Sequence, residues 1–136
     1  MKHLSFPFHH TCELQLKTKV VEKVITCESA ESIIEIFQSL NFRKEQDFKI
    51  PLVLKIEDPN IQSFVLTNYS FPVEHICVNE KNMVEKTYTQ FVSKTTAPFV
   101  QSFTGFKFII LAPVGFIKKY KIKEKETTIS LINLNN

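Results

Sequence analysis

The sequence predicts a β-rich α+β domain, a mostly antiparallel sheet or small barrel with one main helix and one short helix near the C-terminus. Residues 11–26 alternate apolar and polar side chains through Cys12, Leu14 and Leu16, the pattern of one long half-buried strand or of two in succession. At Ser29 the apolar spacing changes to that of a helix. Several short apolar runs follow, separated by residues that favour turns.

The main helix is predicted over about residues 29–40. Glu28 and Glu31 favour its N-terminus, because the helix dipole is positive at that end. Its apolar residues recur every three or four positions, so we expect this face to pack onto the sheet rather than to bind a cofactor. The face consists of Ala30, Ile33, Ile34, Phe37 and Leu40.

The other strands follow from apolar runs between turn residues. They are predicted at residues 50–56, 62–67, 72–79, 83–92, 106–111 and 127–132. Residues 57–60 and 79–82 have the composition of tight turns, so the strand that follows 79–82 should pair back on the one before it as a hairpin.

Two segments are predicted to be neither strand nor turn: residues 93–105 form a polar loop, and residues 113–120 form the short helix, with Pro113 near its start. All 136 residues fit one domain. Residues 1–10 are expected to be a flexible N-terminal segment and residues 133–136 a disordered tail.

Composition indicates a soluble globular protein, with 43% hydrophobic and 23% charged residues. The net charge of +3 is weak, and a single arginine, Arg43, accompanies 16 lysines without a dense basic patch. We therefore expect no nucleic-acid partner. The longest apolar run, from Phe108 to Ile117, is about half a membrane span, so no membrane partner is expected either.

Cysteine usage predicts a cytoplasmic location. Cys12, Cys27 and Cys77 are odd in number and widely spaced, which favours reduced and mostly buried thiols. The N-terminus has no apolar run of signal-peptide length and is expected to be unprocessed.

Three motifs occur in the order seen in a family of small bacterial proteins. They are Ser39-Leu-Asn-Phe-Arg43, Ser63-Phe-Val-Leu-Thr-Asn-Tyr-Ser-Phe-Pro-Val-Glu74 and Pro113-Val-Gly-Phe-Ile-Lys-Lys-Tyr-Lys-Ile122. Over about residues 28–132 the chain resembles the domain of unknown function 192 family, which has no assigned biochemical activity. The chain departs from the family pattern where Ser39 replaces glycine, Val65 tryptophan, Thr67 lysine and Glu74 aspartate.

The resemblance implies Arg43, Asn68 and Glu74 as ligand-binding candidates, and we expect them to converge in space. Each also has a purely structural interpretation. Arg43 and Glu74 can form an ion pair, for which a guanidinium suits a poorly solvated carboxylate better than an ammonium does. Asn68 can cap its own backbone in the turn that precedes Pro72.

Other residues that often carry chemistry are less informative. His75 follows Glu74 on a predicted strand, so the two side chains should point to opposite faces and cannot form one acid/base pair. His9, His10 and Cys12 resemble a metal site in composition, but no second cluster completes four ligands, so we expect no metal. No cofactor motif is recognised, and the catalytic residues stay unknown.

These observations favour a non-enzymatic module that binds a small ligand or a protein. The alternative is an enzyme, hydrolase- or lyase-like, in which Glu74 acts as general base while Arg43 and Asn68 orient the substrate. A raised pKa of the Glu74 carboxylate in an open pocket would favour the enzyme, whereas a closed ion pair of Arg43 and Glu74 would favour the binding module.

Overall fold

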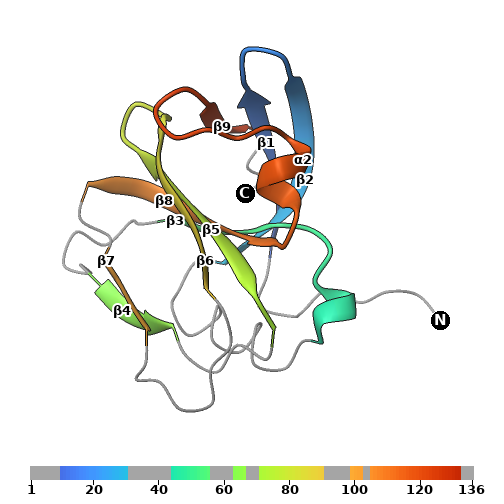
Figure 1. Cartoon of the computed structure of the whole chain (residues 1–136), viewed down its shortest axis with the longest axis vertical. Coiled ribbons are helices and arrows are strands. Elements are labelled where there is room, and N and C mark those ends of the chain that lie inside the picture. Colours follow the sequence, from blue (N-terminus) through green and yellow to red (C-terminus); the bar gives the residue numbers. More distant parts are fainter. Residues whose placement is uncertain are drawn as a thin grey trace.

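In the computed structural model the described residues are 10–30, 44–55, 63–66, 71–90, 99–102 and 105–132. Most of them belong to a seven-stranded sheet. In spatial order its strands are β6 (Val84–Gln90), β5 (Val73–Asn79), β8 (Phe106–Pro113), β3 (Leu52–Lys55), β2 (Glu22–Ala30), β1 (His10–Lys17) and β9 (Thr128–Ile132). A second, two-stranded sheet holds β4 (Ser63–Leu66) and β7 (Phe99–Ser102) (Figure 1).

The prediction of a mostly antiparallel, β-rich fold is confirmed. Every pair of neighbouring strands is antiparallel except β2 and β3, which run parallel over residues 28–30 and 52–54. The expected hairpin between β5 and β6 is present, with Val73 opposite Gln90. Asn79 shapes its turn, because its side-chain oxygen accepts the N–H groups of Lys81 and Met83 at 2.8 and 3.0 Å.

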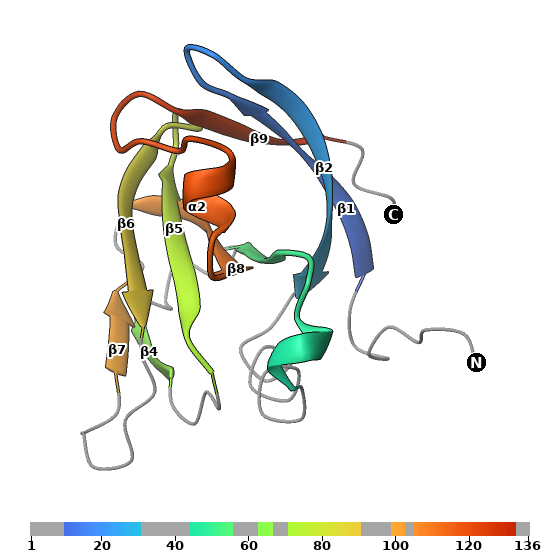
Figure 2. The ribbon, with the colours of Figure 1, turned by 45° about the vertical axis from the view of Figure 1, so that its right-hand side comes forward.

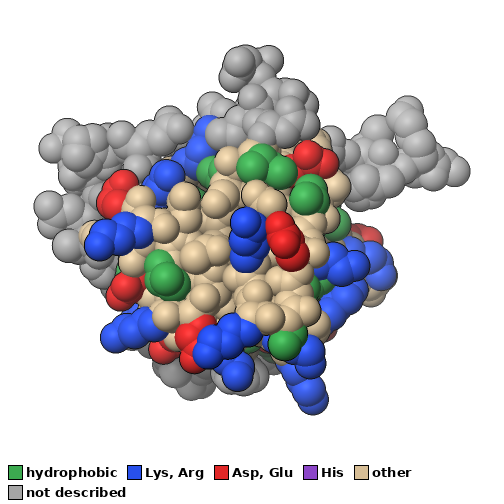
Figure 3. Space-filling model, turned by 90° about the horizontal axis from the view of Figure 1, so that it is seen from above, with side chains coloured by type: hydrophobic (Ala, Val, Ile, Leu, Met, Phe, Trp, Pro, Cys, Tyr) green, Lys and Arg blue, Asp and Glu red, His purple; other side chains and the backbone are tan. Residues whose placement is uncertain are grey.

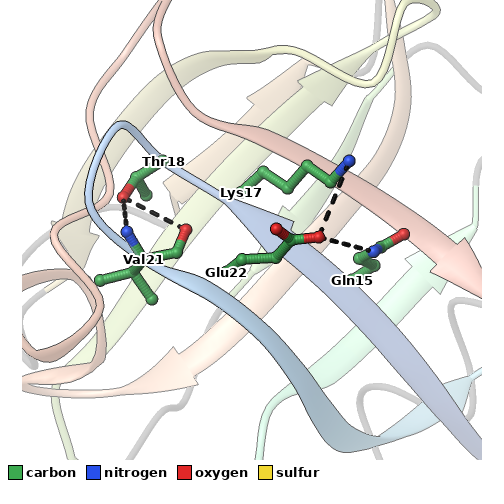
Figure 4. Close-up of polar contacts among 5 residues, drawn as sticks. All are labelled: Gln15, Lys17, Thr18, Val21 and Glu22. Atoms are coloured by element: carbon green, nitrogen blue, oxygen red, sulfur yellow. Dashed lines mark hydrogen bonds and ion pairs between the residues drawn. The ribbon is translucent and has the colours of Figure 1, made fainter.

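Residues 11–26 form two strands, β1 and β2, joined by a tight turn. Thr18 fixes this turn: its hydroxyl oxygen accepts the Val21 N–H at 2.9 Å, and its hydroxyl group donates to the Val21 carbonyl oxygen at 3.5 Å (Figure 4). The backbone N–H of Thr18 donates to the same carbonyl oxygen at 2.8 Å. The resulting register places Lys17 opposite Glu22 and Cys12 opposite Cys27. A threonine hydroxyl thus satisfies backbone donors that no strand partner reaches.

The sheet is strongly curved but open, so the prediction of a small barrel is wrong. Figure 2 shows β9 crossing above the space between β5 and β2. In the described part of the chain, the edge strands β6 and β9 are linked by a single isolated bridge, from Met83, which precedes β6, to Thr128 at the start of β9. The alternating pattern fixes the faces of each strand, whereas closure depends on strand tilt and stagger, which that pattern does not encode.

The core lies on the concave face of the sheet. Alternate residues of the strands point into it, and the short helix α2 (Phe116–Lys119) covers it between β2 and β5 (Figure 2). Its fully buried members include Leu14, Leu16, Cys27, Val53, Ile76, Val78, Val84, Ile110, Ala112 and Ile129. The central strands are buried on both faces: six successive residues of β5, from Val73 to Val78, are buried.

The predicted start of the main helix is wrong, because β2 continues through Ala30 and includes Ser29. The parallel contact with β3 extends the strand at this point, with Ser29 opposite Val53. Tertiary pairing therefore overrides the local helical spacing. Residues 31–40, which hold the rest of the predicted helix, lie outside the described residues, as do residues 1–9 and 133–136.

Two further boundaries differ from the prediction. The predicted loop 93–105 contains β7, which pairs with β4. The short helix is confined to Phe116–Lys119, because β8 continues as far as Pro113. Gly115, whose φ is 100°, then turns the chain into the helix. A short 3-10 helix, η1 (Glu45–Asp47), precedes β3.

Candidate functional site

Glu74 is the predicted site residue that the structure describes, and its carboxylate is bound to the start of α2. The side chain lies on the concave face of β5 and is only 8% exposed. One carboxylate oxygen accepts the Gly115 N–H at 2.9 Å, and the other accepts the Ile117 N–H at 2.8 Å. Each oxygen therefore engages one of the N–H groups that the first turn of a helix leaves without an intrahelical partner.

The sequence around α2 explains why a distant carboxylate is needed. The N-cap residue is Gly115, which has no side chain to accept a hydrogen bond, and no side-chain cap is present there. Glu74 supplies the acceptor from another element, and its negative charge is favourable at a helix N-terminus. The carboxylate is thus tied into the fold, which does not support the hypothesis that Glu74 is a general base.

The other two predicted site residues, Arg43 and Asn68, lie outside the described residues. The expected convergence of Arg43, Asn68 and Glu74, and the alternative ion pair between Arg43 and Glu74, therefore stay predictions. What the structure adds is the position of one member of this set, Glu74, against the strand-to-helix turn at Gly115.

His75 points away from Glu74, as the strand geometry predicts. Its ring is fully buried on the opposite face of β5 and stacks on Tyr88, with ring centroids 4.6 Å apart and planes 10° apart. Burial lowers the pKa of His75 to about 4, although its contact with the Val73 carbonyl oxygen, at 3.2 Å, opposes the shift. The imidazole is therefore neutral near pH 7 and forms part of a packed interior.

The three cysteines are buried thiols, as predicted. Two of them, Cys12 and Cys27, lie opposite each other on β1 and β2 with their sulfurs 2.9 Å apart. Their hydrogen bond lowers the pKa of Cys12 and, with burial, raises the pKa of Cys27, so Cys27 is the partner that keeps its proton. This pairing was not expected from their wide spacing in the sequence.

A groove between β2 and α2 is a candidate ligand site in the described part of the chain. Its volume is about 520 Å³, within the range of small-ligand sites. Three segments line it: residues 23–26 of β2, residues 49–51 before β3, and residues 113–116 with Lys119 and Tyr120 at α2. Glu74 holds the last of these segments in place through Gly115 and Ile117.

The groove has exposed apolar walls. Four large hydrophobic side chains are exposed in the described part of the chain, and three of them line this groove: Val24 at 55%, Ile50 at 37% and Val114 at 56%. Phe116 and Tyr120, whose ring centroids are 4.8 Å apart, add aromatic surface. Single exposed apolar residues are common, but three that meet in one groove indicate an interaction site.

The charges of the groove all have one sign. Lys23, Lys49 and Lys119 line it and are exposed, and none of its described lining residues is Asp or Glu. Seen from above, in Figure 3, charged side chains are otherwise dispersed, and lysines often lie beside acidic residues. The groove therefore suits an anionic ligand that has an apolar part.

Sequence reasoning missed this groove because its segments are far apart in the chain. One local signal was available: Val24 lies in the outward-facing register of β2, between Glu22 and Thr26, where a polar residue is expected.

Among the described residues there is no cluster of three potential metal ligands. No described helix has the length and hydropathy of a membrane span.

The comparisons establish a shared fold. No protein-family model matches the chain, and no curated protein is significantly similar to it. A solved structure of a protein of unknown function from Novosphingobium aromaticivorans has a TM-score of 0.68 and 17% identity, over 87% of this chain and 83% of its own. A "putative transcription regulator" from Sinorhizobium meliloti has a TM-score of 0.73 and 11% identity, over 96% of this chain and 100% of its own.

Identities this low show similarity of fold and carry no function from either protein to this chain. The resemblance to the domain of unknown function 192 family, based on sequence motifs, stays a prediction.

Proposed function

We propose that this protein is a non-enzymatic binding module whose site is the groove between β2 and α2. The observation that supports the proposal is that three exposed apolar residues, Val24, Ile50 and Val114, line the same groove as three lysines. Its ligand has an apolar part that covers the exposed side chains and a negative charge that faces the lysines.

The position of Glu74 supports binding rather than catalysis. A general base needs a carboxylate oxygen that can reach a substrate proton, whereas both oxygens of Glu74 accept N–H groups of the α2 turn. Glu74 is therefore proposed as a positioning residue, which holds the wall of the groove that contains Val114 and Phe116.

The proposal is tested with 8-anilinonaphthalene-1-sulfonate, an anionic probe with an apolar body. We expect saturable binding with enhanced fluorescence, and a loss of affinity of about tenfold in Lys119→Glu, since exchanging attraction for repulsion at a partly desolvated site is worth about 1.4 kcal/mol. Circular dichroism verifies that the protein under test is folded.

Lys118→Glu is the matched control. Both lysines lie in the last turn of α2, so the two variants make the same change of net charge and the same change near the helix C-terminus. Only Lys119 lines the groove. Equal effects of the two substitutions, or no saturable binding by folded protein, would refute the proposal.

A further inference from the structure

Within the described residues, one side of β2 has an edge without a strand partner beside the groove. The parallel pairing of β2 with β3 covers only residues 28–30 of β2. Within the described part of the chain no strand pairs with residues 22–27 on that side, whereas β1 pairs with them on the other. The segment that leads into β3, residues 49–51, is a wall of the groove, so this edge and the groove lie on the same side of β2.

The direction of the backbone groups at this edge follows from Glu28. Its N–H donates to the carbonyl oxygen of Pro51 at 2.9 Å, away from β1. Backbone groups of alternate residues in a strand point to the same side, so those of Val24 and Thr26 also point away from β1. Both residues line the groove. The groove therefore contains alternating backbone donors and acceptors as well as apolar and cationic side chains.

Glu22, the acidic residue next to Lys23 in the sequence, pairs with side chains of β1 and does not line the groove. Glu22 lies opposite Lys17 of β1, and its carboxylate is 3.8 Å from the Lys17 ammonium (Figure 4). The same carboxylate accepts a hydrogen bond from the Gln15 amide at 3.4 Å. Lys119 on the opposite wall lies 5.3 Å from the Tyr120 ring centroid, which places its charge over an aromatic surface of the groove.

We infer that the partner of this groove is an extended acidic peptide, which adds to the edge of β2 as a further strand. This inference rests on the proposed function and specifies its ligand. An anionic lipid or metabolite can satisfy the apolar and charged walls, but it lacks the regularly spaced N–H and C=O groups that the edge of β2 requires. A peptide strand supplies them, with alternate acidic and apolar side chains for the lysines and the valines.

The test uses an acetylated and amidated heptapeptide of alternating glutamate and valine. We expect it to displace 8-anilinonaphthalene-1-sulfonate competitively and to bind at least tenfold more weakly to Lys119→Glu, with less than a twofold change for Lys118→Glu. Two further peptides are methylated on backbone nitrogens: one carries the N-methyl groups on its glutamates and the other on its valines. Because a strand presents only alternate N–H groups to one neighbour, one of the two should lose at least tenfold in affinity and the other much less.

A backbone change in the protein provides a second measurement. Thr26→Pro removes an N–H that points away from β1, a position at which the edge of a sheet tolerates proline. This substitution should lower the affinity for the peptide at least fivefold. Thr26→Ala keeps the N–H and should change the affinity less than twofold. If Thr26→Pro does not fold, the pair of N-methylated peptides decides the question.

The outcomes separate the two proposals. Binding of the fluorescent probe that depends on Lys119, with no displacement by the peptide, would refute the peptide and leave the proposed function standing. Equal affinity of both N-methylated peptides and the parent would refute strand addition. Absence of binding by both the probe and the peptide to folded protein would refute both proposals.

Discussion

Replacing Glu74 by glutamine tests whether this carboxylate holds the strand-to-helix turn. In the structure each of its oxygens accepts one backbone N–H, from Gly115 at 2.9 Å and from Ile117 at 2.8 Å. Glutamine keeps the size of the side chain but has one acceptor oxygen and an NH₂ group. Because both partners are donors, one of the two N–H groups must face another donor in the variant.

The expected cost is about 2 kcal/mol of unfolding free energy. A hydrogen bond to a charged group contributes roughly 1.5–3 kcal/mol, and glutamine loses one such bond and weakens the other. Glu74 is only 8% exposed, so water compensates little at the carboxylate. Gly115 is exposed, however, and its N–H can bind water when it is released, which places the estimate in the lower part of the range.

Urea denaturation followed by far-UV circular dichroism measures the loss, and amide hydrogen exchange locates it. Exchange at Gly115 and Ile117 should accelerate more than at the β5–β8 ladder, since the first turn of α2 opens locally. Glu80→Gln is the control: Glu80 is exposed, and its replacement should change stability by less than about 0.5 kcal/mol. Wild-type stability of Glu74→Gln together with unchanged exchange at both amides would refute the reasoning.

Three other perturbations test separate features. Burial lowers the pKa of His75 from 6.5 to about 4, so protonation of this imidazole favours the unfolded chain. The contribution of His75 to the unfolding free energy should be complete above about pH 6.5 and fall by about 3 kcal/mol as the pH approaches 4. An equally steep fall of the unfolding free energy in His75→Phe would contradict this. An alkylating reagent should leave Cys12, Cys27 and Cys77 unmodified in the native protein and label all three in urea; an unreduced mass that lacks two hydrogens would reveal a bridge instead. Gly115→Ala should cost about 1–2 kcal/mol in urea denaturation, because φ is 100° there although no atom lies within 4 Å of the added Cβ; unchanged stability would show that this backbone conformation is not strained by a side chain.

Much of the strand content could be predicted because it is encoded locally. Turn residues 79–82 predicted the β5–β6 hairpin without reference to the rest of the chain. Alternation over residues 11–26 predicted strand there but left open one long strand or two, and the Thr18 turn that makes it the β1–β2 hairpin was not predicted. The opposite orientations of Glu74 and His75 also follow from strand geometry. These features depend on neighbours within a few residues, where the patterns of side chains carry the information.

The features that failed depend on partners far away in the chain. Ser29 and Ala30 have helical spacing with the residues after them, yet they lie in β2 because β3 pairs with them. The small barrel was predicted from successive short strands separated by turns, whereas in the described residues a single bridge, from Met83 to Thr128, links the two edges of the sheet. Likewise, no local pattern indicates that Phe99–Ser102 pairs with Ser63–Leu66. Long-range pairing adds hydrogen bonds that outweigh local preference.

For the candidate site, the amino-acid sequence alone indicates that Glu74 is a carboxylate among apolar neighbours, which must find hydrogen-bond donors when it is buried. That those donors are the backbone N–H groups of Gly115 and Ile117 follows from the folded structure and from no local pattern. The groove was likewise decided by tertiary structure, because three segments that are distant in the sequence bring Lys23, Lys49 and Lys119 to one rim. Charge and hydropathy are properties of single residues, whereas a concave surface exists only once the chain has brought its walls together.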